Sequence, residues 1–401
     1  MNTRQSEVAA DKLAVLVVIH HYLPGFRTGG PVRTTANMVE KLGDEIDFKI
    51  LTADRDKGTQ QSYATIVPGC WQNVGKAQVR YLCPSELTAL QMSRIISKCS
   101  FDLYYLNSVF AITTIQVLLL YKLRLIPHKP IILAPRGHLD RGALSLKPSK
   151  KRFFLQIAKL IGLFRNVTWH ASDRMELADI VHEFGARYQP RVQVIPNLSS
   201  PDLQYEISRT IPKRGGHLRL VYLSRISRKK NLDYLLKTLI HIQGQVLFDI
   251  YGPIDDPVYW QECQMLFDFL SPGVTVSYNG VAPFDQVHKI LSKYHLFVLP
   301  TLGENFGHVV LEALCAGCLV LISDRTPWRD LAQHGIGWAI PLEQPDQFRQ
   351  VVQQLIELGE DTFTELSKRA WLYGQQVGAD QSTLEKTRQL LSLTAQHLNE
   401  K

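Results

Sequence analysis

The chain has 401 residues, of which 45% are hydrophobic and 20% charged, and it carries a net charge of +8. This length exceeds one ordinary hydrophobic core and the composition is that of a folded globular protein, so we exclude a disordered chain and expect two domains. The positive charge favours an anionic partner: a phosphorylated substrate, nucleic acid or an anionic membrane surface.

The chain is expected to open with a strand, a glycine turn and a helix. Residues 1–12 contain no apolar stretch, which argues against a secretory signal and predicts a cytoplasmic location. Residues 13–19 are a continuous apolar, β-branched run, typical of a central parallel strand covered on both faces. Residues 29–31 (Gly-Gly-Pro) then precede residues 32–42, whose apolar side chains recur at helical spacing.

The rest of the first half continues this alternation. Further strands are predicted at 48–51, 102–106, 130–134 and 192–195, with helical stretches between them. The longest apolar run, 109–121, is too short to span a bilayer and is interpreted as a buried helix. This pattern predicts a doubly wound α/β sheet.

The segment 147–165 has six basic residues and no acidic residue. Its apolar residues recur at helical spacing and favour a helix that faces the core: Phe153, Ile157, Leu160, Ile161 and Phe164. Lys150, Lys151 and Arg152 still need a partner, and we hypothesise that they hold the protein peripherally at the cytoplasmic face of an anionic membrane.

The second half repeats the strand and helix pattern after a break. Proline and glycine cluster in residues 196–201 and 211–216, which places a linker between two domains. New strands are predicted at 218–223, 246–251, 274–278, 296–299 and 319–323. The tail, 381–398, is expected to be a long amphipathic helix that docks through leucines: Leu384, Leu390, Leu391, Leu393 and Leu398.

The six cysteines are scattered and do not indicate a disulfide framework. Cys315 and Cys318 form a single C-x-x-C without a second pair or nearby histidines, which is weak evidence for zinc or redox chemistry. We interpret them instead as the end of a helix, a Gly317 cap and the start of a buried strand.

The segment 300–314 (PTLGENFGHVVLEAL) follows a predicted strand and opens a helix near Gly307. Unpaired backbone N–H groups at a helix start are ready to bind a diphosphate. Glu312 lies one turn beyond His308 and suits ribose hydroxyls, while Glu304 in the preceding loop suits sugar hydroxyls. The alternative is structural: Glu304 complements the helix dipole and Glu312 is a solvated helix residue.

The loop after the first strand of the second domain carries Arg225 and Lys230. Two cations five residues apart in such a loop can straddle a pyrophosphate, although a solvated basic loop is the plainer interpretation. Because an anion-binding helix start is predicted in the same domain, we favour phosphate binding.

These two motifs together resemble the retaining glycosyltransferases of family 4, which have the GT-B fold. The resemblance covers nearly the whole chain. It rests on SRISRKKN (224–231), the E-x7-E spacing of Glu304 and Glu312, DIYG (249–252), NG (279–280) and VIPN (194–197).

The resemblance implies two Rossmann-like domains facing across a cleft. Residues 1–200 would bind the acceptor and residues 213–378 the nucleotide-sugar donor, and residues 379–401 would return as a helix to the N-terminal domain. The expected activity is a retaining hexosyltransferase that moves a sugar from a nucleoside-diphosphate sugar to a glycan or lipid-linked saccharide, in polysaccharide or lipopolysaccharide synthesis. No metal or cofactor would be needed, because protein cations replace the metal.

The resemblance also implies residue roles. Arg225 and Lys230 would neutralise the leaving nucleoside diphosphate, Glu312 would hold the ribose and Gly30 would face the phosphates from the other domain. The donor sugar would be contacted by Glu304, Asn305, Phe306, Gly307, His308 and Val309.

Two features depart from the family pattern. Ser224 and Asn231 stand where glycine is common, which is tolerable if neither position needs a positive φ. Arg136 stands where many members have a histidine that touches the donor sugar. His138 follows two residues later, so the resemblance implies that Arg136 or His138 contacts the donor sugar or the acceptor, and whether His138 takes over the contact of the family histidine stays open.

Three other functional classes compete with this interpretation. A nicotinamide-dependent oxidoreductase needs G-x-G-x-x-G after the first strand, and Gly25, Gly29 and Gly30 have the wrong spacing. A nucleic-acid binder would interleave basic and aromatic residues, which this chain does not. A non-catalytic nucleotide-sugar-binding subunit of the same fold remains the alternative.

Overall fold

The computed structural model describes residues 12–25, 27–145, 148–200 and 211–396. Its first sheet has eight strands in the order β3-β4-β2-β1-β5-β6-β7-β8, all parallel except for β3 against β4. The strands are β1 (Ala14–Val18), β2 (Asp47–Ala53), β3 (Trp71–Val74), β4 (Ala77–Leu82), β5 (Leu103–Asn107), β6 (Ile131–Ala134), β7 (Val167–Ala171) and β8 (Val192–Val194).

Helices cover both faces of this sheet, because successive side chains of each strand point to opposite sides. Leu16 and Val18 of β1 pack in one core with α2, α3, α5 and α6, whereas Val15 and Val17 pack in a second core with α1 and α13. The helices are α1 (Gly30–Leu42), α2 (Ala89–Ser97), α3 (Ile112–Lys122), α4 (Arg141–Ser145), α5 (Pro148–Leu160), α6 (Arg174–Phe184) and a 3-10 helix, Ala186–Arg191.

The second sheet has six parallel strands in the order β11-β10-β9-β12-β13-β14. They are β9 (His217–Leu223), β10 (Gln245–Tyr251), β11 (Val274–Tyr278), β12 (Leu296–Leu299), β13 (Leu319–Ser323) and β14 (Gly337–Ile340). The helices are α7 (Leu232–Leu239), α8 (Pro257–Met265), α9 (Val287–Leu291), α10 (His308–Cys315), α11 (Pro345–Glu357) and α12 (Glu360–Gly378), with 3-10 turns at Arg228–Lys230, Phe267–Phe269 and Phe284–Gln286. The doubly wound α/β prediction is thus confirmed for both halves of the chain.

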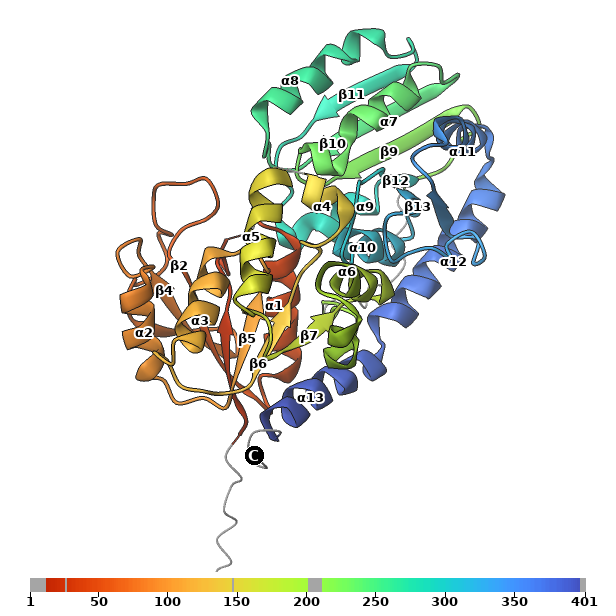
Figure 1. Ribbon diagram of the computed structural model, residues 1–401. Coiled ribbons are helices and arrows are strands. Elements are labelled where there is room, and N and C mark those ends of the chain that lie inside the picture. The colour runs from red at the N-terminus through yellow and green to blue at the C-terminus, as the bar shows by residue number, and fades with distance from the viewer. Residues whose placement is uncertain (1–11, 26, 146–147, 201–210, 397–401) are drawn as a thin grey trace, which may run out of the picture.

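The chain returns from the second sheet to the first at its end. Helix α12 packs on α10 and leads into α13 (Gln381–Gln396), which runs along the first sheet in Figure 1. Leu390 and Leu391 of α13 are buried against strands of that sheet, and the Arg388 guanidinium pairs with Glu45. Leu393 is instead 56% exposed, so its predicted docking role is wrong. Leu398 lies outside the described residues.

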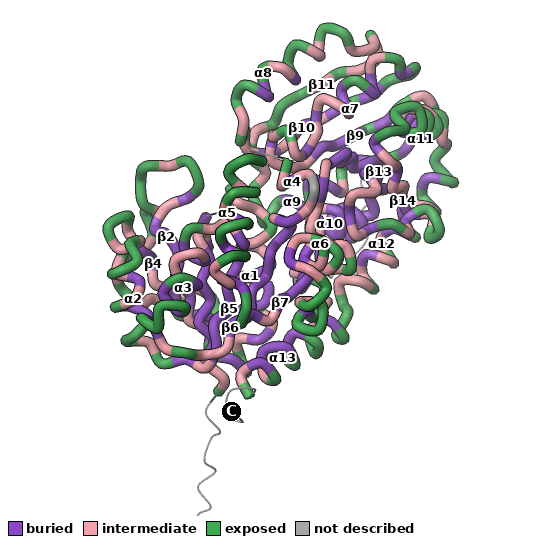
Figure 2. Tube along the Cα trace, in the orientation of Figure 1, coloured by how far each residue is buried: buried purple, intermediate pink, exposed green. Residues whose placement is uncertain are grey.

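Two predicted apolar helices are only partly buried. Helix α3 exposes Ile112 and Leu119 in the run that was expected to be buried. Helix α5 buries Leu155 and Ala158, whereas Phe153, Ile157 and Leu160, which were expected to face the core, are exposed. Figure 2 shows exposed stretches along α5. Among the described residues, no helix combines the length and apolarity needed to cross a membrane.

Candidate functional site

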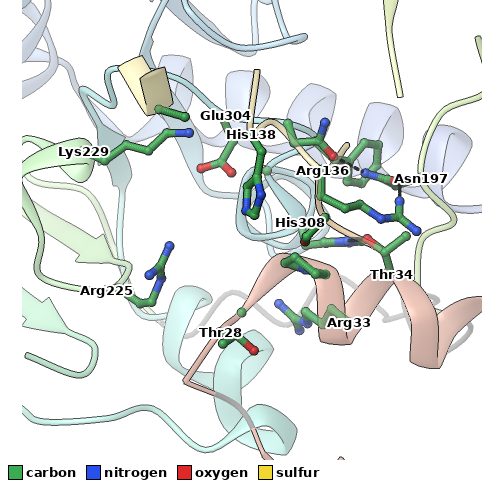
Figure 3. Close-up of a pocket in the computed structure, with 18 of the residues that line it drawn as sticks. Thr28, Arg33, Thr34, Arg136, His138, Asn197, Arg225, Lys229, Glu304 and His308 are labelled. Carbon is green, nitrogen blue, oxygen red and sulfur yellow. Dashed lines mark hydrogen bonds between the residues drawn. The ribbon is translucent and has the colours of Figure 1, made fainter. Parts of the chain in front are cut away.

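A cavity of about 510 Å³ lies between the two sheets and is lined by residues of both halves of the chain. Its walls follow the carboxyl ends of β1, β6, β9 and β12, the edge at which open α/β sheets bind ligands. Figure 3 shows Arg33 and Thr34 of α1 pointing toward the same space as Arg225 and Lys229 of the second half. The arrangement is a cleft between two domains.

The cationic loop after β9 forms one wall of the cleft. Lys230 is buried and its ammonium pairs with the Glu304 carboxylate, while the Arg225 guanidinium lies 2.9 Å from Asp255. Burial lowers the pKa of Lys230, and the Glu304 charge opposes that shift. Burial raises the pKa of Glu304, but the charges of Lys230, Lys229 and Arg225 outweigh it, so the net shift is downward and the carboxylate stays ionised at neutral pH.

Asn231 ends the 3-10 turn that presents Lys230 to the cleft. Its φ is 61° and its ψ is 41°, so the backbone at this position is left-handed. We expected asparagine to be tolerated at position 231 only if that position did not need a positive φ, and this condition is not met. Asparagine is among the few residues other than glycine that adopt this conformation readily. Ser224, by contrast, is not among the residues with positive φ.

The start of α10 faces the cleft from the same domain. Gly307 precedes the helix with a φ of 77°, and no side chain caps the helix start. Asn305, Phe306, Gly307, His308 and Val309 all line the cavity. Unpaired N–H groups at this helix start therefore meet the space beside Lys230, an arrangement suited to an anion.

Of His308 and Glu312, which were predicted one helical turn apart, only His308 lines the cleft. The His308 ring lines the cavity, but its Nε2 lies 2.9 Å from Thr34 Oγ1 of the other domain. Glu312 is buried behind the lining residues, with one carboxylate oxygen paired with Arg33 and the other, Oε2, without a hydrogen-bond partner. Arg33 therefore already engages one of the two carboxylate oxygens that were predicted to hold a ribose.

The β6–α4 loop brings Arg136 and His138 into the cleft. The Arg136 guanidinium is buried and donates to Asn107 Oδ1 at 3.0 Å, to the Tyr105 hydroxyl at 3.1 Å and to Asn197 Oδ1, so its donors serve neighbouring elements. His138 differs, because its Nδ1 is buried and unpartnered at the cavity wall. Burial, with the charges of three nearby cations, lowers the pKa of His138 to about 4, so this imidazole is neutral at pH 7.

Sequence reasoning missed several lining residues near α1. Gly30, which was predicted to face the cleft, begins α1 and lines the cavity. Thr28 and His20 also line it, and each has a buried side-chain atom without a partner, Oγ1 and Nδ1 respectively. Arg33 lies over the Phe284 ring, 4.3 Å from its centroid. The Gly-Gly-Pro turn was the available signal in the sequence, because it begins α1 at the wall of the cavity.

The neutral, buried histidines give a stability prediction. Burial lowers the pKa of His170 to about 3 and that of His138 to about 4, so below pH 6.5 the unfolded chain binds protons that the folded chain does not. Stability from both groups is fully present above pH 6.5 and is lost as the pH falls toward the folded pKa, about 4 for His138 and about 3 for His170. We expect each of these two histidines to lower the free energy of unfolding by roughly 1–2 kcal/mol at pH 5. Calorimetry would show this loss as a falling Tm. A Tm that rises between pH 7 and pH 5 would contradict the assignment.

Two domains of parallel α/β type around a cationic cleft define the GT-B class of glycosyltransferase fold. Solved structures share it along nearly the whole chain: Anabaena HepE in complex with UDP and glucose has a TM-score of 0.67 at 15% identity, over 97% of this chain and 100% of that chain. WaaG, a glycosyltransferase involved in lipopolysaccharide biosynthesis, has a TM-score of 0.63 at 14% identity, over 94% and 99%.

The sequence comparisons also find glycosyltransferases. Residues 204–372 match the family model described as glycosyl transferases group 1. The chain is 31% identical over 135 residues to the gpi3 subunit of phosphatidylinositol N-acetylglucosaminyltransferase of Schizosaccharomyces pombe, over 33% of this chain and 28% of that protein. It is 25% identical over 156 residues to the GtfA subunit of UDP-N-acetylglucosamine–peptide N-acetylglucosaminyltransferase of Streptococcus pneumoniae serotype 4, over 37% and 29%. The matches thus span less than a third of either relative.

Proposed function

We propose that the protein is a retaining glycosyltransferase that moves a hexose from a nucleoside-diphosphate sugar to a saccharide or lipid-linked acceptor, in polysaccharide or lipopolysaccharide assembly. The observation that carries this proposal is the meeting of Lys230, Arg225 and the open start of α10 at one wall of the cleft. A relative named for UDP-N-acetylglucosamine and a neighbour bound to UDP and glucose favour a uridine diphosphate donor.

The free protein already holds its phosphate-binding cations in ion pairs. Glu304 neutralises Lys230, and Asp255 accepts from both Arg225 and Lys57. A diphosphate entering the cleft would compete with these carboxylates for the same cations, and the helix N–H groups would add to the attraction. Release of Glu304 from Lys230 would then free its carboxylate to accept from the sugar hydroxyls.

The reaction follows from this placement. As the bond from the anomeric carbon to the donor phosphate breaks, Lys230 and Arg225 would stabilise the charge that develops on the leaving diphosphate. The acceptor hydroxyl attacks the same face, its oxygen bonds to the anomeric carbon, and its proton passes to the departing phosphate oxygen. The anomeric configuration is retained. Neutral His138, with its unpartnered Nδ1, is suited to hydrogen-bond the donor sugar or the acceptor.

A panel of donors tests the proposal. Purified protein is incubated with uridine and guanosine diphosphate sugars, release of the free nucleotide is measured, and the anomeric proton of any product is assigned by NMR. We expect one uridine diphosphate sugar to be hydrolysed slowly and transferred with retention. Donor binding without hydrolysis or transfer would instead identify a non-catalytic subunit, and an inverted product would disprove the mechanism.

Metal independence is a separate prediction. Among residues 12–25, 27–145, 148–200 and 211–396, no three histidine, cysteine, aspartate or glutamate side chains lie close enough to hold a metal ion. Since protein cations face the proposed diphosphate position, we expect EDTA to leave the rate of nucleotide release within about twofold of its starting value. Loss of activity with EDTA and recovery with Mn²⁺ would show that the cations are insufficient.

A further inference from the structure

The outer face of α5 carries a row of exposed apolar side chains. Phe153 is 65% exposed, Ile157 42% and Leu160 87%, and their i, i+4, i+7 spacing places them on one side of the helix. Leu155 and Ala158 occupy the opposite side and are buried in the core. This exposed row is therefore additional to the core-facing side and is not needed to hold α5 on the sheet.

Helix α3 extends this surface on the same side of the sheet. Residues of α3 and α5 pack in one core, and the Phe110 ring next to the start of α3 contacts Phe154 of α5. Helix α3 exposes Ile112 by 52%, and Leu123 just beyond its end is 65% exposed. Both helices therefore expose apolar side chains on the N-terminal domain.

The charged residues around this surface are almost all positive. Residues 103–172 contain eleven lysines and arginines but a single acidic residue, Asp140. The net positive charge of this segment is therefore larger than that of the whole protein. Asp140 is itself paired with Lys229. Lys150 and Arg152 are exposed on either flank of the apolar row, and neither makes an ion pair with a described residue. Lys159 is less available, because it pairs with Glu183.

Exposure alone does not distinguish this surface, because the second domain has a similar one. Val258 and Met265 of α8 and Phe269 just beyond it are 61%, 62% and 65% exposed. Acidic residues neighbour that group in the sequence, namely Asp256, Glu262 and Asp268. The α8 group therefore differs from the row on α5, which has the unpaired cations Lys150 and Arg152 beside it.

We propose that the outer face of α3 and α5 binds the surface of an anionic lipid bilayer. Phe153, Ile157 and Leu160 would enter the boundary between headgroups and acyl chains, while Lys150 and Arg152 would meet the lipid phosphates on either side. Lys151 of the same helix points elsewhere: its ammonium donates to the Ala143 carbonyl at 2.5 Å and it lines the catalytic cleft. If the proposed function holds, α5 would connect the bilayer to the cleft in which a lipid-linked acceptor reacts.

Flotation with vesicles of phosphatidylcholine alone, or mixed with phosphatidylglycerol, tests the proposal. We expect the wild-type protein to float with the mixed vesicles at low salt, and less at high salt or without the anionic lipid. The F153S/I157S/L160S variant should bind the mixed vesicles at least about tenfold more weakly, and K150E/R152E should also bind more weakly. The matched V258S/M265S/F269S variant should bind like the wild type.

Donor hydrolysis by each variant separates this proposal from the proposed function, since none of the substituted residues lines the cleft. Unchanged hydrolysis with lost vesicle binding would support the membrane surface. Wild-type protein that fails to bind anionic vesicles, or an α5 variant that binds them as well as wild type, would overturn it. A wild-type dimer in sedimentation that becomes monomeric in the α5 variant would also overturn it, because the surface would then bind a second copy.

Discussion

Substitution of Lys230 by alanine is expected to lower the rate of nucleotide release roughly ten- to hundred-fold, and substitution of Arg225 to do the same. Each cation would make a charge-assisted contact with the leaving diphosphate, and loss of one such contact costs about 1.5–3 kcal/mol. The effect should fall mainly on kcat, because the charge on the diphosphate grows as its bond to the sugar breaks.

Arg228 provides the matched control in the same loop. Its guanidinium is exposed and forms a salt bridge with Glu262, and it does not line the cavity. Arg228→Ala should therefore keep near-normal kcat and KM. Because Lys230→Ala leaves the half-buried Glu304 without its partner, the double variant Lys230→Ala, Glu304→Gln checks that lost activity does not reflect misfolding. Near-normal turnover in both Lys230→Ala and Arg225→Ala would disprove the donor site.

Arg136→Ala should act on stability more than on chemistry. Removal of the guanidinium leaves acceptors on Asn107, Asn197 and Tyr105 unsatisfied in a buried setting, which we expect to cost about 3–5 kcal/mol. At about 2–4 °C per kcal/mol, Tm should fall by roughly 10 °C. Arg136→Lys should recover only part of this lost stability. The planar guanidinium reaches three acceptors at once, and a single ammonium cannot.

Two comparisons make the Arg136 result decisive. Arg325 pairs with Glu343 at the surface, so Arg325→Ala should change stability by less than about 0.5 kcal/mol. Differential scanning calorimetry and nucleotide release are measured on the same samples. If Arg136→Ala melts like the wild type but is inactive, Arg136 contacts the donor sugar, as the family resemblance implied.

The strands that lie at the centre of each sheet were the easiest part of the fold to predict. Buried parallel strands such as β1 and β12 are continuous apolar runs, and their predicted bounds agree with the structure to within one residue at each end. Strands β3, β4, β7 and β14 were not predicted. Residues of β3 are half exposed, and β7 (VTWHA) mixes polar and apolar residues, so neither alternation nor an apolar run marks these two strands. The alternation of β4 (AQVRYL) and the short apolar run of β14 (GWAI) were signals that sequence reasoning missed.

In the candidate site, residues with a local motif were placed more successfully than residues whose partners lie far along the chain. The loop at 224–231 and the segment 304–309 meet at the cleft because both follow neighbouring strands of one sheet. The pairing of Arg33 with Glu312 joins positions 279 residues apart, and no spacing in the sequence reveals it. The exposure of Phe153 was missed for a related reason: helical periodicity identifies a face of a helix but does not say which face meets the core.

The most direct test of the central claim is calorimetric titration of UDP into the wild type, Lys230→Ala and Arg228→Ala. A cleft built to hold a nucleoside diphosphate predicts one site per chain in the wild type and in Arg228→Ala, with affinity at least about tenfold weaker in Lys230→Ala. Equal affinity in all three proteins, or no binding of UDP or GDP to the wild type, would show that Lys230 and the start of α10 do not form a donor site.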